Sequence, residues 1–110
     1  MKIAFPTNDR KTLAERTGRA KEFVIYTTEN SEIKNIEYYE NKHEHHKHEH
    51  GEHGHSHKEI TDILKGTDIL YVLKTGPHMK HDLETAGINY VITKEKEISK
   101  LLNQTNQKDV

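Results

Sequence analysis

The 110-residue sequence contains no cysteine. The chain therefore has no disulfide framework, and no thiolate is available to bind zinc or to ligate an iron–sulfur cluster. A transition metal carried by this chain would have to be held by imidazole or carboxylate side chains, by sulfides of its own, or by hydrogen bonds from the protein.

Long hydrophobic runs are also missing. No apolar stretch approaches the roughly 18 residues that mark a candidate transmembrane helix, and the apolar part of Met1–Thr7 is too short for a signal peptide. We therefore expect a cytoplasmic protein that does not associate with membranes.

An excess of charge of either sign is absent as well. Seventeen Lys and Arg residues balance 18 Asp and Glu residues, for a formal net charge of −1. A protein built chiefly to hold nucleic-acid backbones would show a basic excess. The composition thus predicts no nucleic-acid partner.

Enzyme signatures are lacking too. No Gly-x-Ser-x-Gly sequence is present, and the first expected strand, Ile3–Phe5, carries no carboxylate that could hold magnesium. We expect a protein that is not an enzyme.

Histidine is abundant instead. Eight of the ten histidines fall within fifteen residues, which are His43, His45, His46, His48, His50, His53, His55 and His57. Imidazole is a common ligand for Ni, Zn and Cu, so the run predicts binding of transition-metal ions. The alternatives are a solvated spacer and, much less favoured because the run is internal and mixed, a purification tag. The run has no large apolar residue and cannot build a core of its own.

Outside this run, short apolar segments follow the order β-β-β-α-β-α-β-α. Strands are expected near residues 3–5, 23–26, 33–39, 69–73 and 89–92. Pro6 is expected to stop the first strand, and imperfect alternation predicts a bulge near Lys34 and Asn35. Helices are expected to start at a Ser56 capping box, at Gly76-Pro77 and at a Thr93 cap, and Gly66 is placed to end the first.

These elements define one α/β domain over residues 1–102, with the His-rich loop inserted at 41–56 and a flexible polar tail at 103–110. Right-handed crossovers and a hairpin predict a mixed five-stranded sheet of order 3-2-1-4-5, with helices on its faces. Strands one, three, four and five then end at one edge. Ligands of open α/β sheets bind outside that edge, where the loop 7–17, the His loop and the Thr75-Gly76-Pro77 turn all emerge.

Two short segments at this edge, Gly18-Arg19-Ala20 and Gly76-Pro77, contain candidate binding residues. Gly18-Arg19-Ala20 could present a guanidinium and a backbone N–H to an anion, or it could be a plain turn with Arg19 in solvent. Gly76-Pro77 begins a helix whose free N–H groups attract anions. His78 and His81 follow on that helix. They could ligate a metal, although a solvated helix face is the favoured interpretation.

Five stretches form an ordered set over residues 1 to about 102: Met1–Thr7, Gly18-Arg19-Ala20, Glu40–His43, Thr75-Gly76-Pro77 and Ala86-Gly87-Ile88. In this order and spacing they resemble the dinitrogenase iron–molybdenum cofactor biosynthesis family. The resemblance implies a ribonuclease-H-like α/β fold. The chain departs from the family pattern in three places. Thr17 stands where the family usually has Phe, and Leu73-Lys74-Thr75-Gly76-Pro77 stands where it often has Gly-Asn-Ile-Gly-Pro. The His run replaces a Gly-rich loop.

Family members bind, carry or insert metal–sulfur clusters. The resemblance therefore implies a non-enzymatic carrier or assembly protein for a metal or a non-covalently held iron- or molybdenum–sulfur cluster, with donor and acceptor proteins as partners. The alternative, which follows from the histidines, is a divalent-ion buffer or chaperone for Ni, Zn or Cu.

Overall fold

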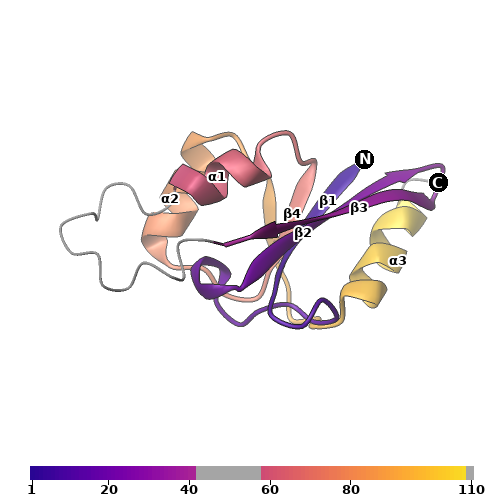
Figure 1. Ribbon diagram of the computed structural model, residues 1–110, viewed down its shortest axis with the longest axis horizontal. Helices are drawn as coiled ribbons and strands as arrows, with labels where there is room; N and C mark the ends of the chain where they lie inside the picture. The colour runs from indigo at the N-terminus through magenta and orange to yellow at the C-terminus, as the bar shows by residue number, and fades with distance from the viewer. Residues whose placement is uncertain (42–57, 109–110) are drawn as a thin grey trace.

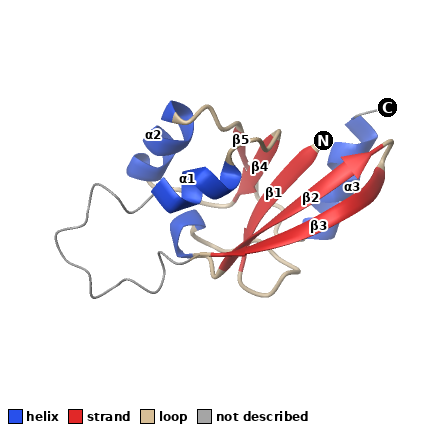
Figure 2. Ribbon diagram, turned by 45° about the horizontal axis from the view of Figure 1, so that its top comes forward, coloured by secondary structure: helices blue, strands red, loops and turns tan. Residues whose placement is uncertain are grey.

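The computed structural model describes residues 1–41 and 58–108 of the chain. Five strands, β1 (Lys2–Thr7), β2 (Glu22–Glu29), β3 (Glu32–Glu40), β4 (Ile69–Val72) and β5 (Tyr90–Ile92), form one sheet of order β3-β2-β1-β4-β5. β1 pairs antiparallel with β2 and parallel with β4, and β5 is parallel to β4. The predicted fold class and strand order are confirmed (Figures 1 and 2).

Strand alternation divides the core into two halves, one on each face of the sheet. On one face, α1 (Lys58–Leu64) and α2 (Pro77–Thr85) pack over a cluster that includes Ala4, Phe23 and Leu70. On the other face, α3 (Ile98–Lys108) packs over the alternate residues of the same strands, Ile3, Val24 and Tyr71. The helices therefore cover both faces, as Figure 2 shows.

Local sequence signals explain several boundaries. Gly66 ends α1 at φ +87° and Gly87 follows α2 at φ +76°, and both angles lie in the left-handed region that favours glycine. The β2–β3 register shifts where Thr27 pairs with Asn35 and Thr28 with Ile33, which leaves Lys34 as the extra residue. The bulge predicted at this point is confirmed.

The sequence predicted that Pro6 would stop the first strand, and this prediction is wrong. Pro6 lies inside β1 opposite Phe23. Lys2 and Pro6 are both even-numbered residues of β1, so their backbone N–H and C=O groups point to the same side of the strand, which is the β4 side. The Lys2 carbonyl accepts a hydrogen bond from Asp68 N just before β4, and the Pro6 carbonyl accepts one from Ala14 N. Within β1, the ladder to β4 covers only Ile3 and Ala4, so the missing N–H of Pro6 falls beyond this ladder.

The last helix also differs from the prediction at both ends. Thr93 caps a short turn by accepting a hydrogen bond from Glu95 N, and α3 begins only at Ile98. The intervening backbone pairs with the loop after β1, through Leu13 N to Lys96 O and Ile98 N to Lys11 O, both at 3.0 Å or less. The predicted tail from Asn103 is helical to Lys108.

Thr105 anchors this helical extension. Its hydroxyl is buried, lies 2.6 Å from the Tyr71 hydroxyl and donates to Leu101 O. The polar sequence after Leu102 gives no apolar signal for this contact.

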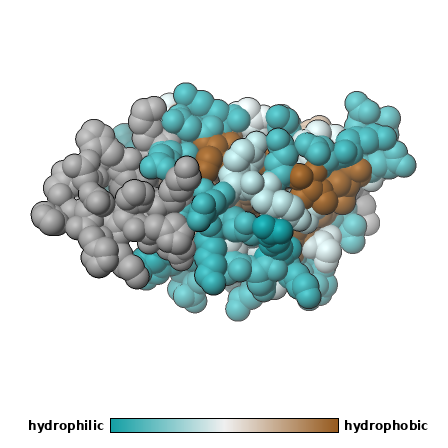
Figure 3. Space-filling view, in the orientation of Figure 1, coloured by the Kyte–Doolittle hydropathy of each residue, from teal (hydrophilic) through white to brown (hydrophobic). Residues whose placement is uncertain are grey.

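The surface is mostly hydrophilic on the face shown in Figure 3, with a compact apolar area at the end of the molecule where the β2–β3 hairpin lies. The exposed aliphatic residues of that hairpin are Ile33 and Ile36. Among the described residues, no helix is long and apolar enough to cross a membrane.

Candidate functional site

A pocket of about 610 Å³ opens at the edge where β1, β3 and β4 end. Its wall combines the segment that precedes β2, the turn after β4, the first turn of α2 and one residue of β5. The lining residues are Arg16, Thr17, Gly18, Arg19, Leu73, Lys74, Thr75, Gly76, Pro77, His78, Met79 and Ile92. The predicted crevice is therefore present at the predicted edge.

Thr17 joins two sides of this pocket. Its buried side-chain hydroxyl donates a 3.0 Å hydrogen bond to Lys74 O, and its backbone N–H donates to the same oxygen at 3.2 Å. An isolated parallel bridge pairs Arg16 with Lys74 beside these bonds. The loop before β2 is thus fixed against the end of β4, although the two are 57 residues apart.

Asn41 fixes the same loop from the other side. The residue is 1% exposed, and its side-chain amide donates to Ala20 O at 2.7 Å and to Gly18 O at 3.2 Å. These two carbonyls flank the end of the 3₁₀ helix η1 (Thr17–Arg19). Asn41 is the last described residue before the histidine run, so the root of that segment is tied to the pocket wall.

Gly18 lies close to α2. A Cβ atom built on Gly18 would lie 3.3 Å from the Met79 Cε atom, which is tighter than ordinary van der Waals contact. A Cβ atom at position 18 would therefore require the flexible end of Met79 to move by a few tenths of an ångström. Glycine at this position brings the two turns close together.

The pocket is electropositive. Arg16, Arg19 and Lys74 are exposed cations in its wall, and none of its lining residues is Asp or Glu. Gly76 caps α2 with extended backbone and has no side chain to accept hydrogen bonds from the first turn. The free N–H groups of a helix start carry partial positive charge. The arrangement suits an anion that accepts several hydrogen bonds.

The structure brings most of the predicted site residues into this wall, but not all of them. Gly18, Arg19, Gly76, Pro77 and His78 line the pocket. Ala20 is fully buried behind it, and His81 is exposed on α2 outside the lining. The eight predicted metal ligands His43, His45, His46, His48, His50, His53, His55 and His57 lie outside the described residues.

Sequence reasoning did not assign four polar residues of the wall to the site: Arg16, Thr17, Lys74 and Thr75. Thr17 and Lys74 had been noted only as departures from the family pattern. Arg16 and Lys74 each lie two residues from a predicted site residue, Gly18 and Gly76, so a search for cations around each turn would have found them. Thr17 gave no signal, because its partner is a carbonyl distant in the sequence.

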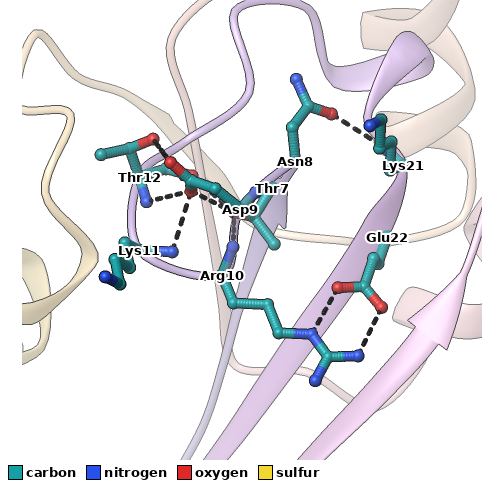
Figure 4. Close-up of polar contacts among 8 residues, drawn as sticks. All are labelled: Thr7, Asn8, Asp9, Arg10, Lys11, Thr12, Lys21 and Glu22. Carbon is teal, nitrogen blue, oxygen red and sulfur yellow. Dashed lines mark hydrogen bonds and ion pairs between the residues drawn. The ribbon is translucent and has the colours of Figure 1, made fainter.

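The first part of the loop after β1 forms a separate network (Figure 4). The Asp9 carboxylate accepts hydrogen bonds from the backbone N–H groups of Thr12 and Lys11 at 2.8 and 2.9 Å, which lower its pKa to about 2. Arg10 binds Glu22 through two nitrogens and lies 3.9 Å above the Tyr38 ring. This network shapes the loop and contributes nothing to the pocket wall.

A preformed ion site is not found in the part of the chain that the structure describes. No three His, Cys, Asp or Glu side chains converge there. The donor set of the pocket is cationic and amide-rich, so it fits a ligand that brings its own anionic atoms better than a bare metal ion.

The fold and the pocket define a small α/β protein with an electropositive crevice. The chain belongs to the dinitrogenase iron-molybdenum cofactor family, whose model matches residues 1–108. The family resemblance seen in the sequence is confirmed. No curated protein matches the chain.

Solved structures with the same fold include the apo form of the orange protein from Desulfovibrio gigas. It is 20% identical, with a TM-score of 0.74 over 99% of this chain and 89% of that one. PH0822 is also 20% identical, with a TM-score of 0.73 over 98% and 91%. The mj0327 protein of Methanocaldococcus jannaschii is 13% identical, with a TM-score of 0.70 over 99% and 90%. At these identities the likeness shows the fold alone.

Proposed function

We propose that the protein is a non-enzymatic carrier or assembly protein for an anionic metal–sulfur cluster, which it holds reversibly in the electropositive pocket. The observation that carries this proposal is a pocket of about 610 Å³ with three cations and no carboxylate in its wall, at the start of a helix. The association of the family with iron–molybdenum cofactor supports a molybdenum- or iron–sulfur cargo.

Reversible holding follows from the chemistry of the wall. The chain has no cysteine, so no thiolate can replace a sulfide of the cluster. Arg19, Arg16 and the N–H groups of α2 would instead donate hydrogen bonds to sulfides at the cluster surface. Such contacts leave the cluster intact and exchangeable, as a protein requires that receives cargo from a donor protein and delivers it to an acceptor.

Binding of tetrathiomolybdate tests the proposal. Chelator-treated full-length protein is titrated with this anion and followed by its visible absorption and by calorimetry. Arg19→Ala should weaken binding about tenfold, because a hydrogen bond to a charged group contributes about 1.5 kcal/mol or more. Lys100→Ala is the matched control, since it removes one exposed positive charge from α3, far from the pocket.

Three outcomes decide between the alternatives. Saturable binding by the wild type, weakened by Arg19→Ala and not by Lys100→Ala, supports the pocket. Equal weakening by both variants indicates non-specific charge attraction, which rising salt would also remove. No binding by the wild type refutes the cluster-carrier function.

The histidine run supports a second candidate function, a buffer or chaperone for Ni, Zn or Cu ions. Eight imidazoles within fifteen residues suffice for two sites of three or four ligands each. Titration of Zn²⁺ and Ni²⁺ into the full chain and into a variant lacking residues 43–57 separates the two functions. Ion binding should be lost with the run, whereas tetrathiomolybdate binding should persist.

A further inference from the structure

Thr75 is anomalous among the pocket residues. Its Oγ1 atom is buried, and within the described part of the chain it is the one such side-chain atom with no hydrogen-bond partner. Most buried polar groups in folded proteins are paired, because an unpaired one loses its contacts with water and gains nothing in return. An orphaned hydroxyl in a pocket wall therefore requires an explanation.

The neighbouring threonine shows that the fold can satisfy a hydroxyl here. Thr17 lines the same pocket, and its hydroxyl donates to Lys74 O, next to Thr75 in the chain. Among the described residues, Thr17 has a structural partner and Thr75 has none. The difference suggests that the partner of Thr75 lies outside the described residues, in a bound ligand.

The position of Thr75 suits contact with a bound anion. It directly precedes Gly76, the N-cap of α2, and it shares the pocket wall with Arg19 and Lys74. Threonine occupies staggered χ1 rotamers, and a step of about 120° exchanges the hydroxyl with the methyl group or the β-hydrogen. A rotamer change can thus move the buried hydroxyl to a place that the methyl group or hydrogen now occupies.

We propose that Thr75 is a specificity-determining residue that donates its hydroxyl hydrogen to an anion bound at the start of α2, after a change of its χ1 rotamer. This inference rests on the proposed function, because it assumes an anionic cargo in the pocket. The residue selects ligands that place an acceptor atom, such as a sulfide or oxide of a metal cluster, near position 75. A ligand of the same size with no polar atom near position 75 would leave the hydroxyl unpaired.

Isosteric substitution tests the inference. Thr75→Val removes the hydroxyl and keeps the shape, whereas Thr75→Ser keeps the hydroxyl. With tetrathiomolybdate as probe, Val should weaken binding about tenfold and Ser should bind within about twofold of the wild type. Thr85→Val, at an exposed position of α2 outside the pocket lining, is the matched control and should bind like the wild type.

Two readouts separate a ligand contact from a structural role. Without ligand, Thr75→Val should melt at or above the wild-type temperature, since it removes an unpaired buried hydroxyl. In wild-type protein, three-bond NMR couplings of Thr75 should report a new χ1 rotamer when tetrathiomolybdate is added. A rotamer change together with weaker Val binding supports the inference.

Other results overturn it. Wild-type and Val proteins that bind equally, or a Val variant that melts lower with unchanged affinity, would make Thr75 structural and leave the cluster-carrier function standing. A wild-type protein that binds no tetrathiomolybdate would refute the proposed function, and the role of Thr75 with it.

Discussion

Asn41→Ala should destabilise the domain and loosen the pocket at once. The Asn41 amide is the donor for Ala20 O at 2.7 Å and Gly18 O at 3.2 Å, and the substitution removes both hydrogen bonds. Ala20 is fully buried, so its carbonyl cannot turn to water after the loss. Asn41→Ala therefore removes the side-chain donor from the buried Ala20 carbonyl and from the partly buried Gly18 carbonyl.

The magnitude follows from these two bonds. A typical hydrogen bond contributes about 1 kcal/mol, and an acceptor left buried and unpaired costs about 1–3 kcal/mol. The buried Ala20 carbonyl takes the cost of an unpaired acceptor, and the partly buried Gly18 carbonyl takes the cost of one typical hydrogen bond. Together they should lower the free energy of unfolding by about 2–3 kcal/mol. For a domain of about 100 residues, each kcal/mol lowers the melting temperature by about 4 °C or more. The melting temperature should fall by about 10 °C.

The assay is thermal unfolding of the metal-free full chain, followed by far-ultraviolet circular dichroism. Asn35→Ala is the matched control, because Asn35 is exposed on β3 and the same atoms are deleted. Exposed substitutions usually change the free energy of unfolding by less than about 0.5 kcal/mol. If Asn41→Ala and Asn35→Ala melt within 3 °C of each other, the Asn41 amide does not hold η1, and our account of the pocket wall is wrong.

Three further predictions concern pH, charge and the histidine run. The pKa of Asp9 is lowered from 3.8 to about 2 in the folded state, so its stabilisation is present above about pH 4 and is lost as the pH falls through about 2. Asp9→Asn should therefore lower the melting temperature at pH 7 and much less at pH 2. Zinc binding by the full chain should weaken steeply from pH 7.5 to pH 5 in calorimetry, because free imidazole has a pKa of about 6.5 and must be neutral to bind; equal affinities would indicate carboxylate ligands. Replacing residues 43–55 by a short Gly/Ser linker should change the apo melting temperature by only a few degrees, because surface-loop length affects closure entropy slowly; a collapse of the fold would contradict this.

The sheet and its order were predictable because the signals behind them are local. Apolar periodicity locates the strands, and Gly66 and Gly87 mark helix ends that need positive φ. Short connections and right-handed crossovers then leave few arrangements of five strands. The edge that carries the pocket follows from that order, so Gly18, Arg19 and Gly76 could be placed there before any side-chain contact was known.

Helix boundaries near the C-terminus were not predictable in the same way. Thr93 has the chemistry of a cap, and residues 94–97 are suitable for a helix, yet their backbone pairs with the loop after β1. The polar segment after Leu102 stays helical as far as Lys108, where the buried Thr105–Tyr71 contact anchors it. In both places a partner distant in the sequence overrides local preference.

The sequence by itself determined the class of fold, the edge that carries the pocket, and the chemistry available there: abundant imidazole, no thiolate, and cations beside two turns. Only the tertiary structure decided which polar groups are paired. Thr17 meets Lys74 and Asn41 meets Gly18 and Ala20 across long stretches of chain, while Thr75 is left without a partner among the described residues. Hydrogen bonds act within about 3 Å, and such proximity between distant residues exists only once the whole sheet has formed.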